Sequence, residues 1–403
     1  MSEVLFVNGA VQNRGYDLDQ YPGKAAGIFL ATVLNRISGN PQVLHLWNNV
    51  GTFNNSEPFA PTERINQKYN SLVMRNYLKF WELGVDDIQI VNDDNEGFCI
   101  WSIDQLSEML DHGDLTIENA DFTACLACEL VIAEAAVIID QCPNCNSERL
   151  LNKRERALFV YTPENRALLL DSRFVYNSMN LRDEIDSLKQ IPDRLLLSRD
   201  RTIGVGLENI GLENKKLDPR FGIGMLALYG GYINDFETVA MTQTTSTLIR
   251  TAPYVGSVIL KNYGNSRRLL YAPHMRINKD VFEETTNDPA GLYVVAAFAS
   301  AQRREDVKLQ RYESASKEFS KFARNVSNIR DSLKRLGIEE LPMRPEFIPD
   351  DYGLTNATAR LAKESGVGVF HLKKSRETTS ISDEQRLAYS QLISIASSLK
   401  LID

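Results

Sequence analysis

The sequence predicts an α/β protein: a doubly wound parallel sheet with a cysteine-rich insertion, followed by an α-helical domain. Three observations support this prediction. Residues 4–47 alternate strand, helix and strand, four cysteines form two closely spaced pairs between residues 125 and 145, and residues 306–336 have the pattern of a long charged helix. Because one hydrophobic core stops growing at about 250–300 residues, a chain of 403 residues is expected to form two or three domains.

The first segment has the pattern of a βαβ unit. Val4 to Val7 form a short, fully apolar run that ends at Asn8-Gly9, as a buried parallel strand does. Residues 23–39 have apolar side chains at helical spacing and end at a glycine, and residues 43–47 are predicted to be a second strand. Ligands of such sheets bind at the carboxyl ends of the strands. A βαβ unit that binds no nucleotide stays open as the alternative.

The α/β pattern continues along the chain, stops at the cysteines and returns after them. Residues 222–232 belong to the part where it returns. The cysteine module is therefore expected to be inserted within one α/β domain. Further helices are predicted at residues 69–83, 101–110 and 291–301, and further strands at residues 85–91, 157–161, 167–170 and 257–263.

The cysteines Cys125, Cys128, Cys142 and Cys145 form a C-x2-C-x13-C-x2-C array. Two thiolate pairs, each closed by a short turn, are what a tetrahedral Zn²⁺ site requires of a chain, so a structural zinc is the preferred interpretation. A disulfide pair or a redox-active C-x2-C motif are the alternatives. Cys99 lies apart from the array in an apolar run and is expected to pack as a small hydrophobic residue.

The last hundred residues are predicted to form a helical domain. The helix at residues 306–336 can end at Gly337, and helices are predicted again at residues 356–365 and 382–399. The lysines and arginines of the first helix are interspersed with Glu and Asp. A solvated helix is therefore preferred over an RNA-binding stripe.

Composition predicts an ordinary soluble protein. Of the residues, 43% are hydrophobic and 24% are charged, and no stretch reaches the ~18–20 apolar residues of a membrane span. The first residues lack the basic and then apolar layout of a secretory signal, so a cytoplasmic location is expected. Reduced thiols in that compartment suit metal binding better than disulfides. The net charge of -8 argues weakly against a chain that coats nucleic acid.

Several short stretches occur in an order that is shared with a known family. They are Leu34-Asn35-Arg36-Ile37-Ser38-Gly39, residues 120–130 followed by Cys142-Pro143-Asn144-Cys145, Leu197-Ser198-Arg199-Asp200 followed by Ile203-Gly204-Val205, Gly231-Tyr232, and residues 288–297. In this order they resemble, in turn, the segment after the HIGH signature, the zinc insertion, a stretch with an Arg and a Trp-Gly pair, a core motif, and the helix after the mobile lysine loop of class I aminoacyl-tRNA synthetases. The methionyl-tRNA synthetases are the members that the chain resembles most.

The resemblance implies four regions and a structural role for the zinc. Residues 1–115 would form the first half of a Rossmann-like catalytic domain of the class I synthetase type, and residues 116–190 a connective insertion with a zinc knuckle. Residues 191–304 would form the second half of the catalytic domain, and residues 305–403 a C-terminal helical domain.

The departures from the family lie at its catalytic signatures. The place of HIGH holds Tyr21-Pro22-Gly23-Lys24, so the glycine is present and both histidines are absent. The place of KMSKS holds His274-Met275-Arg276-Ile277-Asn278-Lys279. The family's acidic residue after the second strand is also missing, because the comparable stretch reads Val50-Gly51-Thr52-Phe53.

By this resemblance the predicted site consists of charged residues for catalysis and of smaller residues around the nucleotide. Lys24 lies at the start of a helix, where it could attract an anion, and a solvated lysine is the alternative. The predicted catalytic residues are Lys24, Arg276 and Lys279, and the predicted ATP-binding residues are Gly9, Tyr21, Gly23, Gly51 and His274. Trp47, Tyr229 and Tyr232 are candidates for the pocket wall, with core packing as the alternative.

These departures argue against ordinary tRNA charging. Adenylate formation depends mainly on positioning and on charge neutralisation at the phosphates, and the loss of one preorganised donor can cost ~10²–10³ in rate. The expected function is therefore a repurposed ATP-dependent ligase that passes an activated amino acid to a small amine or hydroxyl acceptor, as methionyl-tRNA-synthetase-like proteins of specialised metabolism do. The alternative is a non-catalytic paralogue that binds an amino acid, RNA or a protein partner.

Overall fold

The centre of the molecule is a parallel sheet with the strand order of a doubly wound fold. In the computed structural model of the chain, β1 (Val4–Asn8) pairs in parallel with β10 (Thr238–Thr242), which pairs in parallel with β11 (Arg268–Ala272). On the other side of β1 lies β2 (Leu44–Leu46), which pairs in parallel with β3 (Gln89–Val91). Strands β1-β10-β11 form one hydrogen-bonded sheet and β2-β3 form a separate pair, whose β2 contacts β1, so the strands lie in the order β3-β2-β1-β10-β11. The parallel strands confirm the predicted α/β class.

The described part of the chain excludes several predicted elements. These are most of the helix at residues 23–39, the helices at 69–83, 291–301, 356–365 and 382–399, and the strands at 167–170 and 257–263. Among the described helices, none combines the length and the apolar character that crossing a membrane requires. The structure describes residues 4–8, 31, 44–46, 60–67, 89–134, 138–143, 145–162, 192–242, 268–272, 275–277, 280–281, 307–309 and 311–335.

Helix α6 (Pro219–Ile233) precedes β10 and packs on it. Proline suits the first position of a helix, where its missing N–H would have had no partner. Phe221, Ile223 and the run from Met225 to Leu228 are all buried, so this helix is covered on several sides. Tyr229 is also buried, whereas Tyr232 is 45% exposed, so core packing is the role of the first of these two tyrosines.

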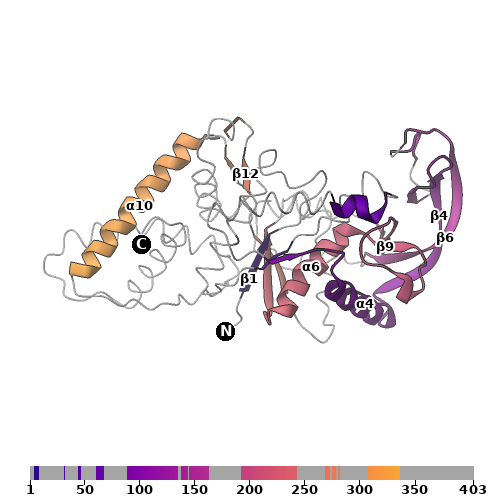
Figure 1. Cartoon of the computed structure of the whole chain (residues 1–403), viewed down its shortest axis with the longest axis horizontal. Helices are drawn as coiled ribbons and strands as arrows, with labels where there is room; N and C mark the ends of the chain where they lie inside the picture. The colour runs from indigo at the N-terminus through magenta and orange to yellow at the C-terminus, as the bar shows by residue number, and fades with distance from the viewer. Residues whose placement is uncertain are drawn as a thin grey trace.

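Helix α4 (Glu96–Asp111) packs beside α6 (Figure 1). It begins at Asn95, whose side-chain oxygen accepts a hydrogen bond from the backbone N–H of Phe98 at 3.1 Å. Phe98, Ser102, Leu106 and Met109 are its buried residues, at the three- and four-residue spacing of one helix face. The helix predicted at 101–110 is confirmed, and it begins one and a half turns earlier because Asn95 caps it there.

The insertion is a four-stranded antiparallel sheet built on a long ribbon. Strands β4 (Leu115–Cys125) and β6 (Leu150–Tyr161) pair over the whole length of β4 and project from one end of the molecule (Figure 1). Strand β5 (Val131–Glu134) adds to the free edge of β4, and β7 (Arg194–Leu196) adds to β6. The small strand predicted at 157–161 is thus the last part of a longer strand, because pairing with β4 extends it toward the cysteines.

Two hydrophobic cores connect these parts. The larger one joins β1 and β10 through α6 and α4 to the base of the ribbon, where Leu115, Leu158 and Val160 are buried. The smaller one lies on one face of the insertion sheet. It contains Ala120, Phe122, Ala157, Phe159 and Leu196, with Val131 packed against it.

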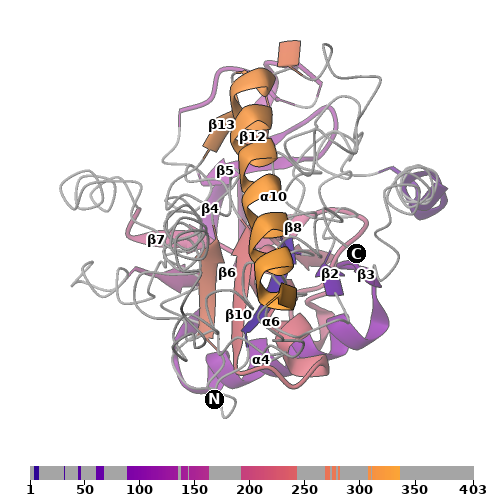
Figure 2. The same ribbon diagram turned by 90° about the vertical axis from the view of Figure 1, so that its left-hand side faces the viewer.

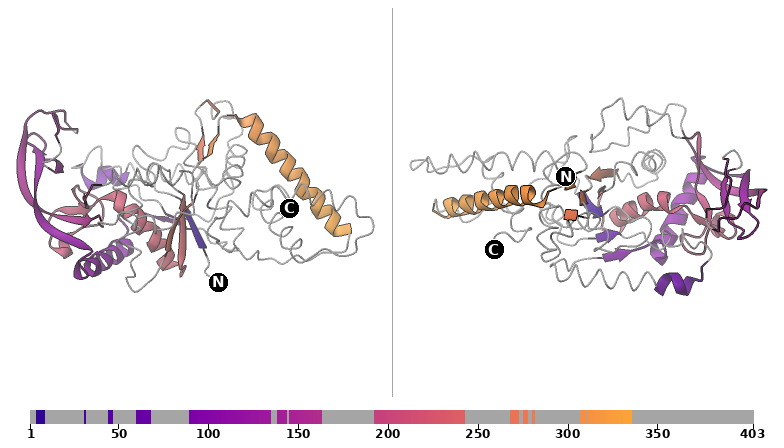
Figure 3. Two further views of the ribbon diagram at one scale, coloured as in Figure 1. Left: turned by 180° about the vertical axis from the view of Figure 1, so that it is seen from behind. Right: turned by 90° about the horizontal axis from the view of Figure 1, so that it is seen from above.

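A hairpin and a long helix complete the described fold. Strands β8 (Ser198–Asp200) and β9 (Lys215–Leu217) form an antiparallel pair beside β6. Helix α10 (Tyr312–Arg335) lies at the end of the molecule opposite to the ribbon, as the views from behind and from above show (Figure 3). Figure 2, seen from that end, places α10 in front of β12 (Met275–Ile277) and β13 (Val307–Leu309).

The long helix predicted at residues 306–336 is confirmed, but its predicted start is wrong. Residues 307–309 form β13, which pairs in parallel with β12, and α10 begins only at Tyr312. Val307 and Leu309 alternate with Lys308, which is the period of a strand, so the pairing with β12 outweighs helical propensity there. The boundaries that the sequence predicts for the four regions of the chain stay predictions.

Candidate functional site

Two cysteine loops of the same local design lie at the tip of the ribbon. In the first, the N–H of Glu129 donates to the carbonyl of Cys125 and the N–H of Cys125 donates to the carbonyl of Leu130, both at 2.9 Å. Glu129 has a left-handed backbone, with φ of 58°. Such a conformation is costly for a residue with a Cβ, so the surrounding contacts must hold the loop in it.

The second loop repeats this arrangement. The N–H of Asn146 donates to the carbonyl of Cys142 and the N–H of Cys142 donates to the carbonyl of Ser147, again both at 2.9 Å. Asn146 has a φ of 57°, and asparagine tolerates this conformation better than most residues. In both loops the left-handed residue directly follows the second cysteine, so the chain reverses after it and turns both sulfur atoms to one side.

The ribbon brings the two loops together. Cys125 is the last residue of β4 and is paired with Leu150, the first residue of β6, so the loops leave the sheet at the same level. The N–H of Leu126 donates to the carbonyl of Arg149 at 2.9 Å and ties them further. As a result the four Sγ atoms lie within 4.8 Å of one another. The array that the sequence predicts as one site is therefore one cluster in space.

The cluster has the donor chemistry of a structural zinc site. Cys125 and Cys142 are buried, Cys128 is half-buried and Cys145 is exposed. Burial raises the pKa of Cys125, but hydrogen bonds from the backbone of Cys128 and Ala127 and from the neighbouring thiols lower it to about 6. The N–H of Ala127 donates to this sulfur at 3.3 Å. Four thiolates could bind a zinc ion in a closed tetrahedron that leaves no position for a substrate.

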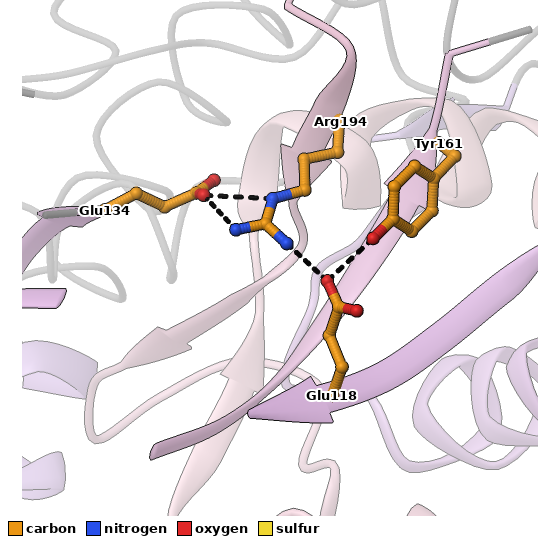
Figure 4. Close-up of polar contacts among 4 residues, drawn as sticks. All are labelled: Glu118, Glu134, Tyr161 and Arg194. Atoms are coloured by element: carbon orange, nitrogen blue, oxygen red, sulfur yellow. Dashed lines mark hydrogen bonds and ion pairs between the residues drawn. The ribbon is translucent and has the colours of Figure 1, made fainter. Parts of the chain in front are cut away.

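Four side chains, one from each strand, tie the insertion sheet together on one face (Figure 4). Arg194 of β7 donates to Glu134 of β5 through Nε at 3.0 Å and Nη2 at 2.6 Å, and through Nη1 to Glu118 of β4. The hydroxyl of Tyr161 of β6 donates to the same oxygen of Glu118 at 2.8 Å. The guanidinium carbon lies 4.4 Å from the centre of the Phe159 ring, so Arg194 also caps the small core.

A second charged network joins the ribbon to the β8–β9 hairpin. The ammonium of Lys215 contacts the carboxylates of Glu155 and Asp200, and Lys153 pairs with Glu155 at 2.8 Å. The side chains of Lys215, Glu155 and Asp200 are only 11%, 14% and 16% exposed, so these charges stabilise one another in a place with little water. Burial raises the pKa of Glu155, but its two lysine partners outweigh burial and hold the pKa below its usual value.

A shallow depression lies over this network and over the small core. Apolar and charged residues line it together. Lys215 pairs with Glu155 and Asp200 within the lining, and the Nε of Arg199 donates to Asp218 outside it at 2.6 Å. Since each of these charges has a partner, the arrangement is that of a structural contact between the insertion and the hairpin. The lining residues are Phe122, Val131, Glu155, Ala157, Leu196, Ser198, Arg199, Asp200 and Lys215.

The sequence did not predict these two networks. Arg194 lies 60 and 76 positions from its carboxylate partners, and Lys215 lies 60 from Glu155, so no local motif contains them. One signal was present. Lys153 and Glu155 have opposite charges two positions apart, which places them on one face of a strand, where they form the observed ion pair.

Most of the residues predicted for the catalytic site lie outside the described part of the chain. These are Lys24, Lys279, Gly9, Tyr21, Gly23, Gly51 and His274. Arg276 is described as the middle residue of β12, which follows β11 along the chain. The carboxyl ends of β1 and β10 are at Asn8 and Thr242, which are paired in register at the point where the strand order reverses. Ligands of doubly wound sheets bind at that point, and the predicted residues follow β1, β2 and β11 in sequence.

Comparison with solved structures shows what this fold is similar to. The structure of methionyl-tRNA synthetase from Mycobacterium tuberculosis bound to methionyl-adenylate is similar to this one. The alignment covers 100% of this chain and 90% of that enzyme, at 13% sequence identity and a TM-score of 0.59. A second methionyl-adenylate complex of that enzyme covers 99% and 90%, at 12% identity and a TM-score of 0.56. Its free form covers 100% and 88%, also at 12% and 0.56. No protein-family model and no curated protein sequence matches the chain.

At this identity the likeness shows the fold alone. The fold of the chain therefore resembles that of methionyl-tRNA synthetases along its whole length, as the sequence motifs predict. The four-cysteine cluster could be a zinc site within that fold.

Proposed function

We propose that the protein is a repurposed amino-acid-activating ligase, which uses ATP to activate an amino acid and transfers it to a small-molecule acceptor in specialised metabolism. The observation that carries this proposal is a contrast within one chain. The alignment with methionyl-tRNA synthetase covers the whole chain, whereas the place of the two HIGH histidines holds Tyr21-Pro22-Gly23-Lys24. The fold supports amino-acid activation, and the changed signature supports a changed reaction.

The proposed reaction has two steps. In the first, a carboxylate oxygen of the amino acid bonds to the α-phosphorus of ATP and the bond to pyrophosphate breaks, which gives an aminoacyl-adenylate. In the second, an amine or hydroxyl of the acceptor bonds to the acyl carbon, AMP leaves, and the acceptor loses a proton. Charge on the phosphates has to be neutralised in the first step. Lys24, Arg276 and Lys279 are the proposed sources of that positive charge, with Gly9, Tyr21, Gly23, Gly51 and His274 around the nucleotide.

The surface charge of the insertion supports a small acceptor over tRNA. Its exposed basic residues in the described part of the chain are Arg149, Lys153, Arg154 and Arg156, and its exposed acidic residues there are Asp121, Glu129, Asp140 and Glu148. The two sets are equal in number. Binding of a nucleic acid backbone requires an excess of positive charge, and the exposed residues in the described part of the insertion provide none.

The proposed zinc has a structural role. The four thiolates would fill its coordination shell, so the metal holds the two loops at the tip of the ribbon and takes no part in the reaction. Such thiolates require a reducing compartment, and this supports a cytoplasmic location.

The test of the ligase is ATP–pyrophosphate exchange, which measures the reversal of adenylate formation. The purified full chain is assayed with each of the standard amino acids, and N-hydroxylated amines are then added as acceptors. The proposal requires exchange above background with at least one amino acid, because only a carboxylate can form the adenylate. Lys24→Ala should reduce that exchange by about 10²-fold if Lys24 replaces a phosphate-neutralising donor. Lys317→Ala is the matched control, because Lys317 is an exposed lysine on α10, at the other end of the chain.

A non-catalytic paralogue is the second candidate, and the absence of both histidines favours it. Such a protein would use the same fold to bind an amino acid, RNA or a protein partner without activation. Calorimetry with ATP separates the two candidates. A folded, zinc-containing protein that binds no ATP and catalyses no exchange with any substrate would exclude the ligase and leave the paralogue.

A further inference from the structure

The four cysteines differ in accessibility according to their place in each loop. Cys125 and Cys142, the first cysteines of the two loops, are buried. Cys128 and Cys145, the second cysteines, are half-buried and exposed. A small solute in water therefore reaches the second cysteine of each loop first, and Cys145 most easily.

Two close contacts between the sulfur atoms run between the loops. The Sγ atoms of Cys125 and Cys145 lie 3.5 Å apart, and those of Cys128 and Cys142 lie 3.7 Å apart. Each contact thus joins the accessible cysteine of one loop to the buried cysteine of the other. An accessible sulfur that becomes oxidised therefore has a buried sulfur of the other loop in contact with it.

We propose that the cluster is a peroxide-sensitive metal site, in which oxidation links Cys125 to Cys145 and Cys128 to Cys142 and releases the metal. This inference rests on the metal site and not on the proposed ligase activity. It assigns the cluster a chemical response in addition to its structural role.

The chemistry requires only a hydroperoxide as oxidant. The Cys145 thiolate attacks one peroxide oxygen, the O–O bond breaks, and a sulfenic acid and hydroxide form. The Cys125 thiolate then attacks the sulfenic sulfur, the S–O bond breaks, and a second hydroxide leaves. Two thiolates have lost two electrons to the peroxide and share a disulfide. A disulfide no longer offers the thiolates that bind zinc, and a second peroxide oxidises Cys128 and Cys142 in the same way.

Disulfides between the loops preserve what the metal held. Both loops stay joined at the tip, and the β4–β6 pairing below them has its own backbone hydrogen bonds as far as Cys125 and Leu150. Disulfides within each loop would leave the loops unconnected. The observed contacts therefore favour a reversible change, in which metal is released while the sheet stays folded, and reduction restores the binding site.

Cys99 is an internal control for this chemistry. It lies outside the cluster, and its sulfur donates to the carbonyl of Asp93 at 3.4 Å. Burial, Asp93 and Asp94 together raise the pKa of its thiol to about 12. Cys99 lacks the metal that would hold the cluster sulfurs as thiolates, the form that reacts with peroxide, so it should stay reduced under conditions that oxidise the cluster.

The test is a titration of the zinc-loaded full chain with hydrogen peroxide. Released zinc is measured with a chromogenic chelator, and disulfides are mapped by mass spectrometry after free thiols are alkylated. Zinc release should rise together with the Cys125–Cys145 and Cys128–Cys142 disulfides, while Cys99 is recovered alkylated. Predominant Cys125–Cys128 and Cys142–Cys145 disulfides would overturn the proposal. So would retention of zinc after Cys145 has lost its thiol.

Two further measurements test whether the zinc release comes from the cluster and whether it is reversible. Cys99→Ser should release zinc at the same peroxide concentration as the unmodified chain, and a shift of more than about threefold would contradict the assigned role of the cluster. Dithiothreitol with added zinc should restore the metal content, while circular dichroism of the oxidised protein stays unchanged. Loss of strand signal on oxidation would show that the cross-loop disulfides do not preserve the sheet. Pyrophosphate exchange is a separate readout, so its absence leaves this test intact.

Discussion

The insertion and the parallel sheet differ in where their determinants lie along the chain. The β4–β6 ribbon and both cysteine loops are contained in residues 115–161, and their partners face one another in simple antiparallel register. The parallel sheet instead pairs residues 4–8 with residues 238–242. Its ligand-binding edge is assembled from segments that are distant in the sequence. The insertion is therefore a local structure, and the sheet is a global one.

The same two regions also differ in how many of the residues expected for their roles the sequence contains. The insertion has four cysteines at ligand spacing and two loops of the same design, so it contains all the residues that a zinc site at the tip of the ribbon requires. The segments that follow β1 and β2 contain Tyr21-Pro22-Gly23-Lys24 and Val50-Gly51-Thr52-Phe53, where the synthetase signatures that the sequence resembles have histidines and an acidic residue. Residues that support a fold and residues that perform a reaction need not be the same, so the fold alone does not give the reaction.

The largest effect is expected from breaking the cysteine cluster. Cys142→Ser removes a buried thiolate, and three remaining ligands should not hold zinc through purification, because structural sites depend on a closed shell. Metal analysis should find about one zinc per unmodified chain and almost none in the variant. Hydrogen exchange should accelerate in residues 115–161 and stay unchanged in residues 219–242 if the insertion is a local structure. Cys99→Ser is the matched control and should keep its zinc.

Equal acceleration of exchange in α6 and β10 would contradict the comparison. It would show that the tip of the ribbon and the parallel sheet unfold as one unit.

The second effect concerns the small core of the insertion. Phe159 is fully buried, is stacked on Phe122 with ring centres 6.5 Å apart, and carries the guanidinium of Arg194. Phe159→Ala should reduce the free energy of unfolding by about 3–5 kcal/mol, because it leaves a cavity under an ionic cluster. Urea unfolding measures this. Tyr161→Phe, which removes only the hydrogen bond of a half-exposed hydroxyl to Glu118, should cost about 1 kcal/mol or less.

The features that could be predicted from the sequence are the local ones, and most of those that were missed depend on distant segments. The cysteine cluster was predictable because short loops with a fixed spacing leave few arrangements for the sulfur atoms. Helix α4 was predicted from periodicity, but its start was placed five residues too late because the cap at Asn95 was not recognised. Arg194 was not, because its partners Glu118 and Glu134 come from strands whose adjacency depends on the completed sheet. Strand β13 was missed for the same reason, since its parallel pairing with β12 outweighs its local preference.

The third effect tests the contact between the insertion and the hairpin. Lys215→Met takes the shared cation from Asp200 and leaves Glu155 with Lys153 alone, and removing one partner of a buried ion pair costs about 3–5 kcal/mol. The pKa of Glu155 is held below its usual value of 4.5, so its contribution to stability is present above about pH 4.5 and is lost as the pH falls through the lower folded value. The difference between the variant and the unmodified chain should therefore be large at pH 7 and shrink below about pH 4.

Urea unfolding at the two pH values measures this difference. Lys153→Met is the matched control, because the side chain of Lys153 is 50% exposed and its pair with Glu155 should contribute about 1 kcal/mol or less. A difference that is the same at both pH values would argue against an electrostatic contact between the ribbon and the hairpin.

The smallest effect lies in the body of the protein, where α4 meets α6. A Cβ on Gly97 would come within 2.6 Å of the hydroxyl oxygen of Tyr229. That ring is held by Phe98 and Trp101, with ring centres at 5.5 and 5.6 Å, so it has little room to move. Gly97→Ala should therefore destabilise the protein by about 1–2 kcal/mol, although alanine is the better helix former by about 1 kcal/mol.

Tyr229→Phe provides the background that separates these two contributions. Without the hydroxyl, the nearest ring atom lies 3.8 Å from the added Cβ, which is an ordinary contact. In that background Gly97→Ala should change sign and stabilise the protein by up to about 1 kcal/mol, as thermal unfolding of the four variants of the cycle would measure. If alanine destabilises both backgrounds equally, the α4–α6 contact is not the cause. The destabilisation by alanine would then come from another contact of α4.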